Sequence, residues 1–131
     1  MENKNSKEDK ELMLKLQMFE KQIQNIIQQI DAVEKTILEM EFLKENLNEL
    51  KNKKNQEIFA SIGKGIFIKS KIISEELLVD VGGKNFVKKT IPETQKIIEK
   101  QIKNLNLVKK ELEKEMKKID EDLTKSMSKS V

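Results

Sequence analysis

The segments nearest to a chemical site are two glycine-lysine turns. Val81-Gly82-Gly83-Lys84 looks like the end of a phosphate-binding loop, in which backbone N–H groups and a lysine hold phosphate. That loop also needs glycine where Leu78 stands and serine or threonine where Asn85 stands. Gly63-Lys64-Gly65 lacks the third glycine of a dinucleotide loop, because Ile68 occupies its position. Hairpin turns are therefore the favoured interpretation, and nucleotide binding is disfavoured.

The composition excludes most other chemistry. The 131 residues include no histidine and no cysteine, so imidazole and thiolate are absent as metal ligands or nucleophiles. All 26 basic residues are lysines, so the guanidinium fork that suits phosphate is missing as well. The 23 carboxylates are scattered, with no pair in a recognisable pocket. The sequence predicts a protein that is not an enzyme and has no cofactor or metal.

The helix breakers divide the chain into three parts. The four glycines and the single proline all lie between positions 63 and 92, so both flanks are free of them. Residues 1–131 are expected to form one domain, because a chain of this length hardly holds two.

Residues 10–56 are predicted to form one long helix, preceded by a flexible segment at 1–9. Apolar residues recur at alternating steps of four and three, which is the spacing of a coiled-coil seam. The series breaks at Lys44 and resumes one residue earlier at Leu43, Leu47 and Leu50, which predicts a local shift of the seam. The regular seam residues are Leu12, Leu16, Phe19, Ile23, Ile26, Ile30, Val33, Ile37 and Met40.

Residues 92–127 are predicted to form a second helix, followed by a frayed tail at 128–131. Thr90 is the expected N-cap, with Pro92 in the first turn and Glu93 three residues after the cap. The same spacing of four and three places these residues in a seam: Ile91, Gln95, Ile98, Ile102, Leu105, Lys109, Leu112, Met116, Ile119, Leu123 and Ser126. Two such helices joined by a short connection predict a mainly α fold, a long antiparallel two-helix coiled coil.

Residues 57–91 alternate apolar stretches with turns, which predicts two successive β-hairpins. The turns contain Gly63, Gly65, Gly82 and Gly83. Because four short strands cannot close a core alone, their apolar residues are expected to be covered by other subunits. The predicted assembly residues are Ile58, Phe59, Ile62, Ile66, Phe67, Ile68, Ile72, Leu77, Val79, Val81, Phe86 and Val87.

The first predicted helix is longer than the second, so its segment at 11–19 is expected to overshoot the coiled coil. Met13, Leu14 and Met18 lie off the seam, and exposed apolar side chains of this kind mark an interaction surface. The alternatives are that this end frays or packs against a neighbour. The expected tip residues are Leu12, Met13, Leu14, Leu16, Met18, Phe19, Ile119, Leu123 and Met127.

Over about residues 10–127, this order of elements resembles the α-class subunit of prefoldin. The most specific segments are 62–67, which is similar to the first hairpin turn of that family, and 78–87, which is similar to its second hairpin. Subunits of the β class have one hairpin, so two hairpins favour the α class. The resemblance implies that hairpins from several subunits join into an inter-subunit β-barrel from which the coiled coils hang.

The resemblance also implies a function. It predicts an ATP-independent chaperone, a holdase, whose coiled-coil tips bind unfolded proteins and pass them to a group II chaperonin. The implied partners are β-class subunits in a heterohexamer or further copies of the chain in a homo-oligomer or filament, and both remain open.

Two other readings use the same elements. A self-assembling coiled-coil scaffold would share the fold, but it has no need of the off-seam residues Met13, Leu14 and Met18. Nucleic-acid binding is disfavoured because arginine is absent and aromatic residues are few. The lysines that it would use are Lys64, Lys69, Lys71, Lys84, Lys88 and Lys89.

The sequence also bears on location. No apolar run approaches the roughly 20 residues of a membrane span, and the polar N-terminus has no apolar signal core. A cytoplasmic protein without membrane contact is expected.

Overall fold

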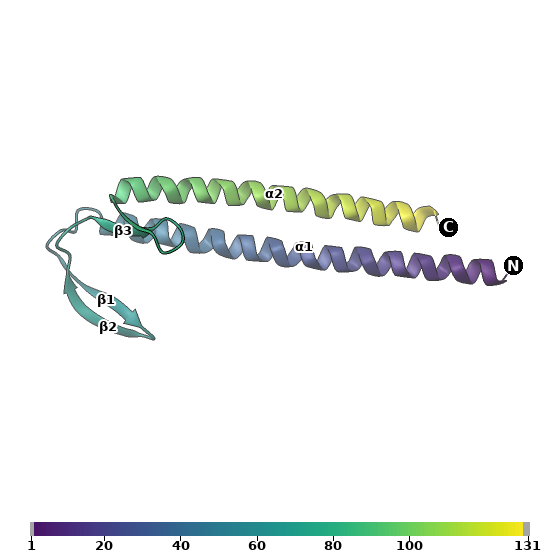
Figure 1. Cartoon of the computed structure of the whole chain (residues 1–131), viewed down its shortest axis with the longest axis horizontal. Helices are drawn as coiled ribbons and strands as arrows, with labels where there is room; N and C mark the ends of the chain where they lie inside the picture. The colour runs from purple at the N-terminus through teal and green to yellow at the C-terminus, as the bar shows by residue number, and fades with distance from the viewer. Residues whose placement is uncertain (1, 130–131) are drawn as a thin grey trace. The chain divides into compact units, whose positions relative to one another are not determined.

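The computed structural model consists of two long helices and of four short strands that lie between them in the sequence (Figure 1). It describes the backbone of residues 2–129 and the side chains of residues 6–128. The elements are α1 (Glu2–Leu50), β1 (Glu57–Gly63), β2 (Ile66–Lys71), β3 (Leu77–Asp80), β4 (Phe86–Lys89) and α2 (Ile91–Lys129). The expected fold class is confirmed for the single chain.

The four strands form two separate antiparallel hairpins, β1–β2 and β3–β4. The first turn has Lys64 at φ 48° and Gly65 at φ 77°. Positive φ at both central residues is typical of the type I′ turn, whose twist matches that of the flanking strands. The glycine-lysine segments of the sequence are therefore hairpin turns, as predicted.

The first helix begins and ends earlier than expected. It starts at Glu2 rather than at residue 10, so the segment predicted to be flexible is helical from Glu2 onward. It stops at Leu50 rather than at 56, because Asn52 (φ 60°) and Asn55 (φ 71°) adopt the left-handed conformation that ends helices. Asparagine is the residue other than glycine that enters this region most readily, and two of them here give the stop signal that the sequence reading missed.

Thr90 is the N-cap of α2, as expected. Its Oγ1 accepts a hydrogen bond of 3.2 Å from the Glu93 backbone N–H. The Thr94 hydroxyl donates to the Thr90 carbonyl over 2.8 Å. The start of α2 is therefore fixed by side-chain hydrogen bonds, and the helix continues to Lys129 instead of ending at 127.

The chain divides into two compact units, residues 1–37 with 104–131 and residues 38–103. In the first unit α1 and α2 are packed along the predicted seams. Ile26 and Leu112 are buried, and the Lys109 ammonium lies 3.1 Å from the Glu34 carboxylate on the facing helix. Half-buried seam residues continue this packing: Leu12, Leu16, Phe19, Ile23, Ile30, Val33, Ile37, Leu105, Met116, Ile119 and Leu123.

The core of the second unit lies where both helices meet the second hairpin. Leu47, Ile91 and Ile98 form its buried centre, and Leu77 of β3 packs against them. The apolar residues of both hairpins were expected to be covered by other subunits, but Leu77 of the second hairpin is covered by the helices of its own chain. The cluster includes no described residue of the first hairpin.

Lys44 stays in the seam and Leu43 does not enter it, so the shift predicted at Leu43 was wrong, whereas Leu47 and Leu50 pack in the core as predicted. The ammonium of Lys44 reaches across to Glu99 over 3.2 Å, while Leu43 is 45% exposed. A lysine can hold a seam position because its aliphatic stem packs there while the charged end reaches a partner at the rim. The steps of four and three therefore continue through Lys44 to Leu47.

We expect Ile98→Ala to lower the free energy of unfolding by about 2–5 kcal/mol, because it leaves a cavity in this core. The matched control is Leu107→Ala on the same helix, where the side chain is 55% exposed and the change should stay below about 0.5 kcal/mol. Urea unfolding followed by circular dichroism, at one fixed protein concentration, measures both. Equal losses in the two variants would contradict this core.

Candidate interaction surfaces

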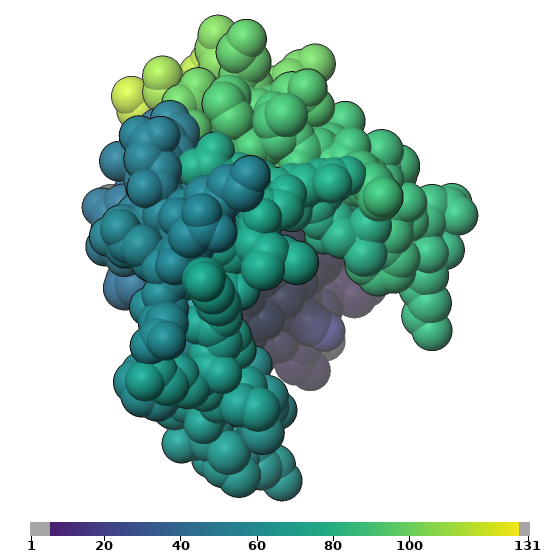
Figure 2. Space-filling view, turned by 90° about the vertical axis from the view of Figure 1, so that its left-hand side faces the viewer, coloured from purple at the N-terminus to yellow at the C-terminus, as the bar shows by residue number. Residues whose placement is uncertain are grey.

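The first hairpin has two different faces, because residues paired across an antiparallel ladder share a face. One face is mostly apolar and consists of Ile58, Ala60, Ile66, Ile68, Ser70 and Ile72, hereafter the apolar face. Ile66 is 58% exposed and Ile68 is 54% exposed, so this face is open near the turn, while its other residues are half-buried. Figure 2 shows the atoms of this hairpin, in teal, at the lower edge of the view.

The opposite face of the first hairpin mixes aromatic and charged side chains. It consists of Glu57, Phe59, Phe67, Lys69 and Lys71, hereafter the aromatic face. Phe59 is 71% exposed, and the Lys69 ammonium lies 3.0 Å from the Glu57 carboxylate. The residues predicted for assembly include members of both faces, and the register of the strands now separates them.

The second hairpin is covered on one face only. Leu77 and Val79 are half-buried towards the helix ends. Leu78 and Phe86 point the other way and are 66% and 57% exposed. Leu78 was missed as a candidate, although its alternation with Leu77 and Val79 placed it on the outer face.

Most of the predicted assembly residues are accessible. Four are half-buried: Ile58, Ile72, Leu77 and Val79. Eight are exposed: Phe59, Ile62, Ile66, Phe67, Ile68, Val81, Phe86 and Val87. Ile73, which was not singled out, is 77% exposed and lies beyond the end of β2.

The Gly82-Gly83 turn uses its own backbone donors. The Val81 N–H donates to the Asn85 carbonyl over 2.9 Å, and the Asn85 N–H donates to the Gly82 carbonyl over 3.1 Å. The Gly82 N–H donates to the Asp80 carboxylate over 2.9 Å. A phosphate-binding loop leaves such N–H groups open to its ligand, so these bonds support the turn interpretation.

The far end of the helix pair differs from the expected overshoot. Glu34 faces Lys109, the two helices are antiparallel, and each rises 1.5 Å per residue. Twenty residues further towards the far end, Leu14 of α1 therefore stands opposite Lys129 of α2. The segment at 11–19 is therefore mostly paired, and only residues 2–13 extend past Lys129, the last described residue of α2. The difference arises because α1 begins and α2 ends further out than the sequence reading allowed.

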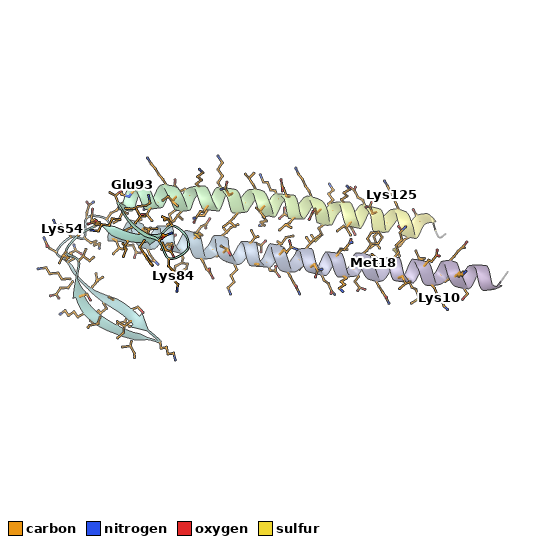
Figure 3. All side chains as sticks on the ribbon, viewed as in Figure 1. Lys10, Met18, Lys54, Lys84, Glu93 and Lys125 are labelled. Atoms are coloured by element: carbon orange, nitrogen blue, oxygen red, sulfur yellow. The ribbon has the colours of Figure 1, made fainter. Side chains whose placement is uncertain are left out.

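The predicted tip residues separate into two sets at this end. Leu12, Leu16 and Phe19 on α1 and Ile119 and Leu123 on α2 are half-buried in the seam. Met13, Leu14, Met18 and Met127 are exposed, by 61%, 62%, 62% and 53%. In Figure 3, Met18 and Lys125 mark this end on the two helices. The off-seam positions carry the accessible apolar surface, as the spacing indicated.

An apolar ridge on α1 was missed by the sequence reading. Leu38 and Phe42 lie one turn apart and are 65% and 68% exposed. Glu39, Glu41 and Glu45 surround Phe42 within one turn. The missed signal was the spacing of four residues between two large apolar side chains on the outer face.

Metal sites and membrane spans were considered for residues 2–129. No group of three or more histidine, cysteine, aspartate or glutamate side chains could hold a metal ion among the described residues. In that same range, neither helix combines the length and apolar character of a membrane span.

Comparison with known proteins places this arrangement among related chains. The family model described as "Prefoldin subunit" matches residues 19–129. "Prefoldin subunit alpha" of Methanobrevibacter smithii is 31% identical over 96 residues, covering 72% of this chain and 66% of that protein. The namesake from Methanosphaera stadtmanae is 25% identical over 89 residues, covering 68% and 64%. The chain thus spans just under two thirds of the length of these two relatives.

Two further matches extend the comparison. "Prefoldin subunit alpha 1" of Thermococcus kodakarensis is 32% identical over 100 residues, covering 75% of this chain and 68% of that protein. A solved structure of filamentous PFD from Methanocaldococcus jannaschii superimposes with a TM-score of 0.80 at 19% identity. It covers 88% of this chain and 97% of that one, so the two share a fold.

The pairing at the far end can be tested with cysteines, because the chain has none of its own. We expect a short bifunctional maleimide to join Phe19→Cys to Leu123→Cys within one chain, because these two seam residues lie opposite each other on the two helices. The control is Ile26→Cys with Leu123→Cys, which is about 10 Å further along the seam. Preferential joining of the control pair, read by mass spectrometry, would show a register one heptad away.

Proposed function

The chain is an α-class member of the prefoldin family, and from that premise we propose that it is a subunit of an ATP-independent chaperone of the cytoplasm. In this proposal the ends of the helix pair bind non-native polypeptides and pass them to a group II chaperonin. The observation that carries the proposal is the exposure of Met13, Leu14 and Met18 on a helix whose seam is already filled. These side chains lie off the seam and are mostly exposed, so they are available to a ligand.

The chemistry of this end suits a binder of many sequences. Methionine and leucine side chains are flexible and fit irregular apolar surfaces, as a surface that accepts varied unfolded segments requires. Each contact is small and therefore weak. Several arms held together in one oligomer raise the total affinity through their high effective concentration, while each single contact still releases readily. Such a cycle needs no nucleotide.

Assembly is assigned to the hairpins. The apolar face of the first hairpin is too exposed for a single chain in water, and pairing with hairpins of other subunits in a β-barrel would bury it. The partners in this proposal are β-class subunits or further copies of the chain.

A second candidate function is a scaffold or filament protein of the same fold with a weak client role or none. The observation that favours it is the similarity in fold to a filamentous relative. The exposed methionines and leucine at the far end distinguish the two, since a scaffold does not need them.

We expect the triple substitution of Met13, Leu14 and Met18 by serine to reduce protection of an unfolded protein from aggregation by about tenfold or more. The reason is that it removes three exposed apolar contacts on each arm while leaving the seam residues in place. Light scattering of a chemically unfolded client without ATP measures protection by the assembled protein.

The matched control is the triple substitution of Ile27, Leu107 and Val108 by serine, which removes exposed apolar side chains elsewhere on the same helices. It should protect as the unmodified protein does. Equal protection by both triple variants would leave the scaffold as the better account.

We expect Ile68→Asp to prevent assembly, because it places a charge in the middle of the apolar face. Sedimentation velocity should show smaller species than those of the unmodified protein, with circular dichroism unchanged. Ile73→Asp is the control, as Ile73 is 77% exposed beyond the end of β2, and it should assemble almost normally. Normal assembly of Ile68→Asp would remove the apolar face from the interface.

A further inference from the structure

The aromatic face of the first hairpin lacks a cover even in the proposed barrel. A two-stranded ribbon has two opposite faces, and a barrel that buries the apolar face leaves the other on its outside. Phe59 and Phe67 on that outer face are 71% and 58% exposed. Two large aromatic side chains exposed on a hairpin of two short strands are unfavourable in water unless another surface covers them.

The ridge formed by Leu38 and Phe42 on α1 is a surface of matching character. Its two apolar side chains are exposed by 65% and 68%. Glu39, Glu41 and Glu45 give its rim a negative charge. Lys44, the one lysine within this stretch, points instead to the seam, where it pairs with Glu99.

The aromatic face has the opposite charge. Lys69 is paired with Glu57, the only acidic residue of this face, so its positive excess comes from Lys71 and from Lys64 at the adjacent turn. Each surface therefore has two large apolar side chains at its centre and a charged rim, and the two rims have opposite signs. Such complementarity favours association and fixes orientation.

We propose that the aromatic face of the first hairpin of one copy docks on the Leu38–Phe42 ridge of a second copy. The occupant is a second copy because the rims of the two surfaces have opposite charges, and both surfaces stay exposed within one compact unit of the chain. This inference rests on the proposed assembly through hairpins, to which it adds a second contact.

The geometry of the contact has a consequence for the assembly. A contact between two different surfaces of the same chain is heterologous, so each copy offers one surface to each of two neighbours. Repetition of this contact closes a ring or extends a filament. The surface involved is small, so it reinforces hairpin pairing instead of replacing it.

The test again uses the absence of cysteine from the chain. Phe42→Cys and Phe59→Cys are made in separate full-length proteins with tags of different mass, and the two are mixed and allowed to exchange subunits. A short bifunctional maleimide should join them into a mixed dimer. The control pair is Leu107→Cys with Phe59→Cys, because Leu107 is an exposed apolar residue on the other helix.

We expect the Phe42–Phe59 pair to react about tenfold faster than the control pair. Equal rates, or a mixture that stays monomeric, would overturn the proposal. A chain carrying both cysteines that joins only to itself would also overturn it, because the hairpin would then cover its own helix.

Charge reversal supplies an independent measurement. The double variant Glu41→Lys/Glu45→Lys should need about tenfold more protein to reach half-maximal assembly. The double variant Lys69→Glu/Lys71→Glu should show the same increase. Mixing the two double variants should restore assembly towards that of the unmodified protein. Absence of this rescue would overturn the docking. Protection of an unfolded client from aggregation is measured on the same samples. It depends on the end that carries Met13 and Met18, so it tests the proposed function separately from the docking.

Discussion

The mutual burial of the two helical seams is the constraint on which the rest of the molecule depends. Each helix is amphipathic along its length, and each satisfies the apolar stripe of the other, with Ile26, Leu112 and Ile98 buried at the centre. Because the seams are filled by each other, apolar side chains outside them have no partner within the helix pair. Much of the accessible apolar surface lies on the hairpins, at the far end and on the Leu38–Phe42 ridge.

Two lysines in the seams show how the pairing is oriented. Lys109 faces Glu34 in one compact unit, and Lys44 faces Glu99 in the other. Exposed ion pairs of this kind add little stability, on the order of 0–1 kcal/mol each. Their value lies in specificity, since a polar seam position favours the one register in which its charge meets a partner. Leucine at either position would pack better and define the register less.

The hairpins meet the same constraint in two different ways. The second hairpin packs Leu77 against the core at the helix ends, and Val79 on the same face is half-buried. No described residue of the first hairpin belongs to that core, and its aromatic face and the turn end of its apolar face stay exposed. This contrast is the reason that the proposed assembly relies on the first hairpin.

Much of this protein is determined by its sequence alone. Steps of four and three, glycine-containing turns and the Thr90 cap specify two seams and two hairpins, because these features depend only on local backbone geometry and on which side of an element a residue lies. The ends of the helices needed the structure, since α1 stops where two asparagines take left-handed conformations, and neighbouring residues do not fix that choice. Lys44 in the seam, Leu14 opposite Lys129 and Leu77 in the core were likewise decided by tertiary packing. Each of these contacts depends on which residue of a distant segment lies opposite. The pattern along one segment does not contain that information.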